Sequence, residues 1–357
     1  MSKAAELAAL ISSQSALENR NFIINGAMQV AQRGTSTTGS NSNNVFPACD
    51  RWKVGFTSGG TYDFSQSTDT PEGFSSSIKV KCASTDTSIA SGDEFIVQHR
   101  IEAQDLQRLA YGTSAAKNIT LSFYAKAVNK TGTYCVHIQK NDSTAAYIYK
   151  EYTLTTSWQR FELTFPANAV VQASGGAIAN DNGIGLIIMF ILMNGSSTQG
   201  TDAKDQWSTT NHRSSSSQVN FMDSTSNEWY ITGVQLELGE QATPFQHEDI
   251  STTIAKCQRY FFREGNVGEA LHYVTTGPVA GQRWYFQALP VQMRADPADT
   301  IYAAGSQAQS GKLQKDDGTF VDVSGSYTSQ DTLGLLLSGQ DNTHNFFFFD
   351  FDVDAEL

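Results

Sequence analysis

The chain has 357 residues, a formal net charge of −12 and only 17% charged residues. An acidic chain lacks the electrostatic footprint of a protein that binds nucleic acid or an anionic membrane surface. The length favours two or three domains, and the many aromatic residues between small polar turn residues favour strands, so we expect an all-β protein.

Four cysteines are widely spaced and form no CxxC pair: Cys49, Cys82, Cys135 and Cys257. A zinc site usually needs paired ligands, so we expect free buried thiols, consistent with assembly in a reducing cytoplasm; the count alone leaves a disulfide open. The N-terminus lacks the apolar core of a signal peptide, and the longest apolar run, 184–193, is too short to span a bilayer. We expect no metal, no cofactor and no membrane insertion.

Residues 3–18 predict a short amphipathic helix, because apolar side chains recur at three- and four-residue steps. These side chains are Leu7, Leu10, Ile11 and Leu17. The helix is too short to be stable alone, so we expect residues 1–20 to be an attachment segment that packs on sister copies or on another protein. Folding back on the chain's own domain is the alternative.

Residues 21–242 show short apolar strands at regular spacing, separated by Gly-Gly, Thr-Gly, Asn-Asp and Asn-Gly breakers. We expect Trp52 in the core, since it alternates with Val54 and Phe56. One helical interruption is expected at 103–109. Ten strands over this length match a two-sheet jelly roll. The predicted strands are 51–56, 62–67, 77–83, 95–101, 118–127, 132–139, 147–154, 159–166, 184–192 and 229–238.

Residues 243–262 predict a linker helix between two β-domains. Pro244 ends the preceding strand ladder, and Asp249 or Ser251 can cap a helix at 252–260. Apolar residues recur along it at three- and four-residue steps: Ile254, Cys257 and Phe261. This stripe, with Ile254 and Phe261 foremost, is a candidate for subunit packing; packing on the chain's own sandwich is the alternative.

Residues 263–357 predict a smaller C-terminal β tip, too small for a fully self-sufficient core. Its predicted strands are 270–275, 283–289, 300–304, 320–324, 332–337 and 345–353. Four aromatic residues in a row place rings on both faces of the last strand: Phe346, Phe347, Phe348 and Phe349. Such a strand needs cover on both sides, and we expect sister subunits to provide it; an ordinary two-layer sandwich is the alternative.

Several phrases resemble, in the same order, virion appendage proteins of tailed phages, especially marine ones, that carry a carbohydrate-binding-module-like jelly roll. They are NFIINGAMQVAQRG, DRW, QHRIEAQDL, NITLSFYAKA, TGTYCVHI, TSWQRFELTFP and NEWYITGVQLELG, followed by ATPF and CQRYFF. The resemblance covers most of residues 20–262. Near the C-terminus, VQMRADP and the final DAEL resemble phrases of the same proteins.

This resemblance implies a virion structural protein, made in the host cytoplasm and carried on the particle. The expected form is a homotrimeric short tail fibre whose N-terminal helix docks on other virion proteins and whose body adheres to host-surface glycans. A capsid-decorating or head-fibre protein is the alternative. Similar jelly rolls often hold a structural calcium ion, but the sequence shows no EF-hand-like loop.

The chain shows no catalytic signature. None of the six histidines sits in HExxH or HxH spacing, and GxSxG, GxxxxGK[ST] and GxGxxG are absent. We therefore expect no enzyme. A particle-borne glycan-processing enzyme is the third interpretation, because a pair of catalytic carboxylates about 5–10 Å apart would be assembled only in three dimensions.

Sugar binding in such a sandwich would need an exposed aromatic ring in a polar loop, with amide or other polar groups beside it. Trp207, followed by Asn211 and His212, fits that pattern and is the candidate ligand site. A large indole rarely stays fully exposed, so a lid over the edge of the sandwich is the alternative role of Trp207.

Overall fold

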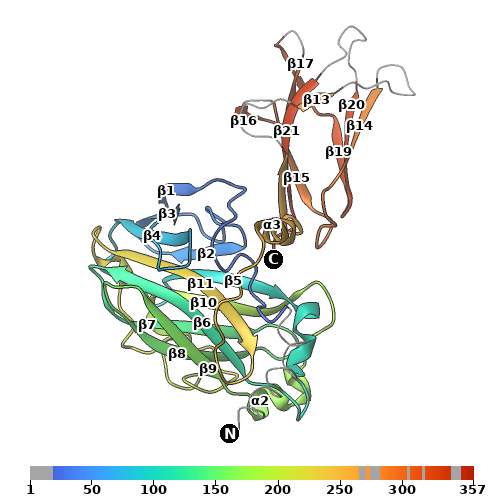
Figure 1. The fold of residues 1–357 in the computed structure, drawn as a ribbon. Helices are drawn as coiled ribbons and strands as arrows, with labels where there is room; N and C mark the ends of the chain where they lie inside the picture. Colours follow the sequence, from blue (N-terminus) through green and yellow to red (C-terminus); the bar gives the residue numbers. More distant parts are fainter. Residues whose placement is uncertain (1–18, 265–270, 274–281, 304–305, 316–317, 339–346) are drawn as a thin grey trace. The chain divides into compact units, whose positions relative to one another are not determined.

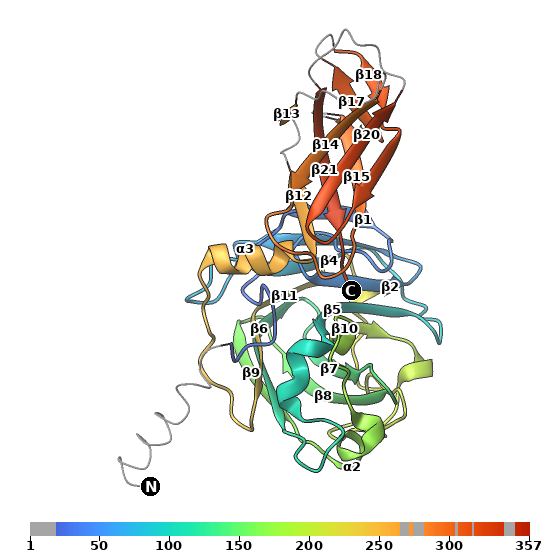
Figure 2. The same cartoon turned by 90° about the vertical axis from the view of Figure 1, so that its right-hand side faces the viewer.

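The computed structural model describes residues 19–264, 271–273, 282–303, 306–315, 318–338 and 347–357. The chain divides into two compact units, Met1–Glu248 and Asp249–Leu357. Both are built mainly of antiparallel strands (Figures 1 and 2), which confirms the all-β fold class. The predicted attachment helix with Leu7, Leu10, Ile11 and Leu17 lies outside the described residues.

The first unit is a jelly roll of two sheets. One sheet has six strands in the order β1-β3-β4-β11-β6-β9, and the other has five in the order β2-β5-β10-β7-β8. The six-stranded sheet consists of β1 Ser36–Ser40, β3 Thr61–Ser67, β4 Ser77–Ser84, β11 Glu228–Leu238, β6 Ile119–Val128 and β9 Gln159–Phe165. The five-stranded sheet consists of β2 Trp52–Thr57, β5 Glu94–Glu102, β10 Ile184–Asn194, β7 Gly132–Lys140 and β8 Ala146–Leu154.

The core lies between the inner faces of these two sheets and is rich in aromatic rings. Phe190 is central: its ring centroid is 5.0 Å from that of Phe123, 6.0 Å from that of Trp229 and 6.2 Å from that of Trp52. Trp52 is fully buried, and its indole N–H donates to the Asn25 carbonyl at 3.1 Å. The predicted core position of Trp52 is confirmed.

All ten predicted strands of this unit are present, with ends that differ by one or two residues. The predicted helix at 103–109 is a 3₁₀ turn, η1 Ala103–Leu109. Sequence analysis missed β1, because Ser-Thr-Thr-Gly-Ser contains no apolar residue; it is an edge strand defined by its pairing with β3. The four cysteines are free and buried, as expected.

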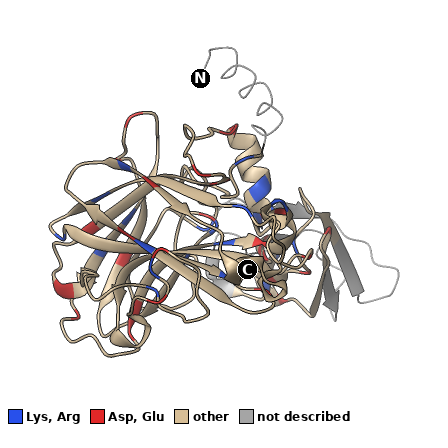
Figure 3. Ribbon diagram, turned by 90° about the horizontal axis from the view of Figure 1, so that it is seen from below, with Lys and Arg blue, Asp and Glu red and all other residues tan. Residues whose placement is uncertain are grey.

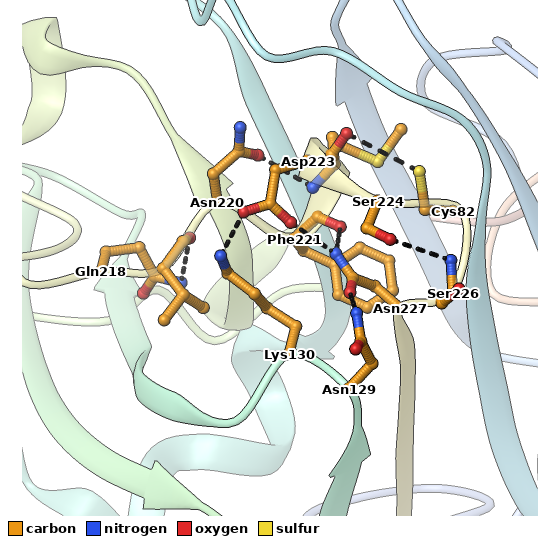
Figure 4. A network of polar contacts seen from close by, with 12 residues as sticks. Cys82, Asn129, Lys130, Gln218, Asn220, Phe221, Asp223, Ser224, Ser226 and Asn227 are labelled. Carbon is orange, nitrogen blue, oxygen red and sulfur yellow. Dashed lines mark hydrogen bonds and ion pairs between the residues drawn. The ribbon is translucent and has the colours of Figure 1, made fainter.

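A polar network fixes the segment that leads into β11 (Figure 4). The Asn227 side-chain amide donates to the Phe221 carbonyl and to Asp223 Oδ1, both at 2.8 Å, and the Asn129 amide donates to Asn227 Oδ1 at 2.5 Å. Lys130 forms an ion pair with Asp223. The β6–β7 turn and the short 3₁₀ turn η4, Phe221–Asp223, are therefore held together by side chains rather than by strand pairing.

The segment after β11 folds back onto the six-stranded sheet through a buried carboxylate. Glu237 is 3% exposed and accepts hydrogen bonds from the Thr243 amide at 2.8 Å and from the Thr243 hydroxyl at 2.7 Å. Gln235 Nε2 donates to the same carboxylate at 2.9 Å. The β11 ladder ends at Leu238, six residues before Pro244, where the sequence predicted the break.

Thr243→Val is expected to lower the free energy of unfolding by about 1–2 kcal/mol, because it removes one hydrogen bond to a buried charged group and leaves that group short of a donor. Thr243→Ser keeps the hydroxyl and is the matched control. Urea denaturation of the three proteins measures the difference. Equal stability of the valine and serine variants would contradict this role of the hydroxyl.

The second unit begins with α3, Ile250–Gln258, which Asp249 caps by accepting a hydrogen bond from the Ser251 amide at 2.7 Å. One sheet has seven strands: β12 Phe261–Glu264, β13 Leu271–Tyr273, β15 Ala298–Ala303, β16 Ser306–Ser310, β17 Lys312–Lys315, β18 Phe320–Asp322 and β21 Phe347–Asp354. The other has three: β14 Gln282–Ala288, β19 Gly325–Thr328 and β20 Thr332–Ser338. Four of these strands were not predicted from the sequence: β12, β16, β17 and β19.

The residues expected to pack subunits together differ in how much of each side chain is exposed within the single chain. Phe261 and Phe349 are only 3% and 1% exposed within the single chain. Phe349 packs with Phe351 and Leu313 in the core of this unit. Ile254 is 36% exposed. Phe346 lies outside the described residues, and the side chains of Phe347 and Phe348 are likewise outside them.

Candidate functional site

The outer face of the five-stranded sheet is covered by residues 195–219, here called the cover loop. Its backbone bridges to β8 at Tyr147–Ser208 and Tyr149–Lys204. Lys204 pairs with Glu151 at 2.6 Å. Beneath the loop lies a small second core made of Ile96, Cys135, Tyr149, Ile187, Met189, Ile191 and Ala203. The outer face of this sheet therefore packs against the chain's own cover loop and does not form an open groove.

Trp207, the predicted sugar-stacking residue, belongs to the cover loop but is only 2% exposed. Its ring meets Tyr111 edge-on, with centroids 5.8 Å apart, and it forms part of the main core. The indole thus closes the sandwich and presents no free ring face to a sugar. The prediction of an exposed platform at Trp207 is wrong, because burying an indole stabilises the fold more than exposing it.

Asn211 and His212 have other neighbours within the cover loop. Asn211 Oδ1 accepts a hydrogen bond from Arg213 Nε at 3.4 Å. His212 lies against Gly200, and its Nδ1 is 3.8 Å from a carboxylate oxygen of Asp202. The three predicted ligand residues are therefore not gathered around one exposed surface.

His137 is an unusual feature under the cover loop. It is fully buried, its ring stacks on Tyr147 with centroids 5.9 Å apart, and neither ring nitrogen has a hydrogen-bond partner among the described residues. Burial, with a smaller contribution from the nearby positive charge of Arg213, lowers the pKa of His137 to about 3. The imidazole is therefore neutral at physiological pH.

The outer face of the six-stranded sheet has a different character. Strand register places a row of polar residues side by side across five strands. From β1 to β6 the row consists of Ser36, Ser65, Lys79, Tyr230 and Lys126. Strand alternation directs their neighbours in sequence into the core, so the fold displays the row on the outside.

A cavity of about 290 Å³ opens at the β1 end of this row. It is lined by Ser36, Thr37, Thr38, Asp63, Phe64, Ser65, Lys79 and Lys81. Asp63 is oriented by the Gly39 amide, which donates to its Oδ1 at 2.8 Å. Lys81 makes no ion pair within the described part of the chain. The cavity thus offers hydroxyl, carboxylate and ammonium groups at one place.

The other end of the row is an aromatic ledge formed by Trp158 and Tyr230 around Lys126. The Lys126 ammonium lies 5.3 Å from the Trp158 ring centroid and 4.8 Å from the Tyr230 ring centroid. Asp69 accepts from Lys126 Nζ at 2.6 Å and from Trp158 Nε1 at 3.0 Å. Tyr230 is almost fully buried, whereas Trp158, just before β9, is partly exposed. We refer to Trp158, Tyr230, Lys126 and Asp69 as the ledge.

Two carboxylates hold lysine ammonium groups in place: Asp69 holds that of Lys126, and Glu228 holds that of Lys79. Glu228 pairs with Lys79 at 2.7 Å and accepts from the Tyr230 hydroxyl at 2.7 Å. For both Asp69 and Glu228, burial pushes the pKa upward, but the hydrogen bonds from their lysine and aromatic partners outweigh it and lower the pKa. Both groups stay ionised at neutral pH, so the ledge and Lys79 are pre-positioned before any ligand arrives.

Figure 3 shows acidic and basic residues interspersed along the ribbon, with most of it uncharged. Within the described residues, no group of three or more His, Cys, Asp or Glu side chains is arranged to hold a metal ion. None of the described helices is both long enough and apolar enough to span a bilayer.

The row was not predicted from the sequence, although part of its signal was present. Alternation along the predicted strands 77–83, 118–127 and 229–238 would have assigned Lys79, Lys126 and Tyr230 to the outward faces. Which strands are neighbours was the missing information, and no local pattern supplies it.

No protein-family profile and no curated protein sequence matches the chain. Solved structures resemble it distantly. A family 4 carbohydrate-binding module is 16% identical, with a TM-score of 0.31, over 60% of this chain and 98% of that one. A family 11 module from Clostridium thermocellum, solved with a β-1,3-1,4-mixed-linked tetrasaccharide, is 12% identical, with a TM-score of 0.30, over 60% and 99%.

The enzymatically active domain of tailspike protein 4 of bacteriophage CBA120 is also similar. It is 15% identical, with a TM-score of 0.32, over 61% of this chain and 21% of that one. At these identities the similarity concerns the jelly-roll fold alone.

Proposed function

We propose that the first unit binds a glycan on the outer face of the six-stranded sheet, in the cavity between β1, β3 and β4 and along the ledge beside it. One observation carries this proposal: the strand register joins the polar cavity to a partly exposed tryptophan through Lys79 and Tyr230. Sugar sites combine a few oriented polar groups with an aromatic surface, and both are present here.

The cavity would recognise hydroxyl groups of the sugar. Asp63 accepts hydrogen bonds, Lys81 donates them, and the hydroxyls of Ser36 and Ser65 do both. Lys81 has no ion pair to break within the described residues, so its ammonium can turn to a ligand at little cost. Lys79 is held by Glu228 and would orient the sugar rather than reach for it.

We propose binding without cleavage. Glycoside hydrolysis usually employs two carboxyl groups that flank the scissile bond. Asp63 is the only carboxylate among the residues that line the cavity. The two carboxylates beside it are already bound to cations of the chain, Asp69 to Lys126 and Glu228 to Lys79. Incubating the protein with the glycan that it binds and assaying for new reducing ends tests this; their release would favour a glycan-processing enzyme.

We propose further that the chain is a virion structural protein of a tailed phage, in the form of a homotrimeric short tail fibre, with a capsid-decorating protein as the alternative. The ordered sequence phrases of residues 20–262 support this. Three weak glycan sites on one particle-bound stalk would gain adhesion through effective concentration. Light scattering of the purified chain should give three times the chain mass of 38.9 kDa; a single-chain mass would contradict the trimer.

A glycan array with matched variants tests the site. Lys81→Ala and Trp158→Ala are each expected to weaken glycan binding about tenfold, through the loss of a charged hydrogen bond and of an aromatic surface respectively. Lys117→Ala, an exposed lysine outside the cavity, is the control and should bind like the wild type. Unchanged binding by both site variants would rule out this face.

A further inference from the structure

Trp158 extends the polar row on the outer face of the six-stranded sheet by one more position. Ala125 of β6 pairs with Gln159 of β9, so the residue before Gln159 lies opposite Lys126. The Lys126 ammonium is 5.3 Å from the Trp158 ring centroid, which agrees with this placement. The partly exposed indole therefore stands at one end of the row, and the cavity lies at the other.

The gap between the cavity and this indole follows from the order of the strands. The middle strand of the cavity is β3, which contributes Asp63 and Ser65, and four steps across the sheet lead from it to β9. Neighbouring strands are about 4.8 Å apart, so these steps amount to about 19 Å. The Trp158 ring leans back toward β11, because its centroid is 6.1 Å from that of Tyr230. This shortens the gap by about one strand spacing, to about 14 Å.

A gap of this length sets the size of a ligand that can touch both ends. A pyranose ring with its linking oxygen is about as long as one strand spacing. A sugar residue held in the cavity therefore leaves the indole bare, and so does a disaccharide. With one residue in the cavity, an extended chain reaches Trp158 with the residue three places further along.

The groups between the two ends offer weaker contacts. The charged side chains of Lys79 and Glu228 are partly exposed but bound to each other, and so are those of Lys126 and Asp69. They can form hydrogen bonds with sugar hydroxyls and need no charge on the ligand. Tyr230 beneath them is almost fully buried and provides no stacking surface. The strongest contacts of the row therefore stand at its two ends.

We propose that the glycan bound by the first unit is a chain that lies across the strands, with one residue in the cavity and another stacked on Trp158. This inference rests on the proposed glycan-binding function and adds the minimum ligand, which is four sugar residues. Both contacts then belong to one molecule, and the second forms at the high effective concentration that the first creates.

Isothermal titration calorimetry of the full chain tests this inference with cello-, xylo- and β-1,4-galacto-oligosaccharides of two to six residues. In a series that binds, the Kd should fall about tenfold between the disaccharide and the tetrasaccharide and change little beyond it, because the aromatic contact is then complete. Equal Kd values for the disaccharide and the hexasaccharide would overturn the inference and leave the glycan-binding function standing. Failure of every hexasaccharide to bind would contradict that function and the inference with it.

Trp158→Ala separates the stacking contact from other effects of length. It should bind the disaccharide like the wild type and lose the tenfold gain with the tetrasaccharide. Trp158→Phe keeps a ring without the indole N–H and should keep most of the gain. Lys81→Ala should weaken all lengths by the same factor, since Lys81 lines the cavity.

Unchanged thermal unfolding shows that the alanine variant retains the fold, and the length series of the wild type decides the matter if it does not. A folded Trp158→Ala protein that keeps the full gain with length would overturn the inference. So would one that binds the disaccharide and the hexasaccharide more weakly by the same factor.

Discussion

Trp52→Ala is expected to lower the free energy of unfolding of the first unit by about 3–5 kcal/mol. Trp52 is fully buried and contacts His99 and Phe190 between the two sheets, with ring centroids 5.2 Å and 6.2 Å away. Alanine would leave a large cavity at the centre of the sandwich. It would also remove the hydrogen bond that the indole N–H donates to the Asn25 carbonyl, leaving that buried acceptor with the Met28 amide alone.

Guanidinium denaturation, followed by circular dichroism, measures this effect. Trp52→Phe keeps most of the volume and should cost less than alanine. Val128→Ala, at an outward position of β6 that is 38% exposed, is the control and should change stability by less than about 0.5 kcal/mol. A Trp52→Ala protein within about 1 kcal/mol of the wild type would show that Trp52 is not central to the core.

The second large effect is acid destabilisation through His137. Burial lowers its pKa from an ordinary value of 6.5 to about 3, so the unfolded chain binds a proton at a higher pH than the folded chain. The stability that the neutral, buried His137 contributes is fully present above pH 6.5 and is lost as the pH falls toward about 3. Between pH 6 and pH 4 the loss from His137 alone is about 2–3 kcal/mol.

His137→Phe tests this, because phenylalanine keeps a ring against Tyr147 and removes the titrating group. Its unfolding free energy, measured at pH 6 and pH 4, should fall by about 2–3 kcal/mol less than that of the wild type. The pKa of the buried His99 is also lowered, by burial and by Arg51. His99 is present in both proteins, so its effect on the pH dependence of unfolding cancels in the comparison. The same pH dependence in both proteins would show that His137 does not resist protonation.

The sequence predicted the strands of the first unit well because their signal is local. Apolar and polar residues alternate within each strand, and turn residues flank it. The strands predicted at 118–127 and 229–238 are present with nearly the same ends. The edge strand Ser36–Ser40 has no such alternation and depends on its pairing with β3. Likewise, β16 and β17 are short polar strands that the tertiary pairing defines.

The candidate site could be predicted only in part. Lys79, Lys126 and Tyr230 were identifiable as outward residues, but they are distant in sequence and meet only through the order β4-β11-β6. Trp207 shows the opposite difficulty: a polar sequence around an indole suggested an exposed loop, whereas the loop folds down so that the indole reaches the core. Composition around a residue does not determine the direction of its side chain.

A trimer would carry three copies of the glycan site proposed for the first unit. Individually weak sites then suffice for lasting adhesion, provided that the surface allows simultaneous binding. Weakening this site would reduce adhesion to a dense glycan surface far more than it reduces binding of a short soluble saccharide.

The most direct measurement of the central claim is an amide NMR titration of the isotope-labelled chain with the glycan that scores highest on the array. Binding at the proposed site should concentrate the shift changes on β1, β3 and β4 around Ser36, Asp63 and Lys81 and extend them to Trp158. These changes should disappear in Lys81→Ala. Shift changes confined to the cover loop, residues 195–219, would contradict the central claim and would place the glycan over the five-stranded sheet instead.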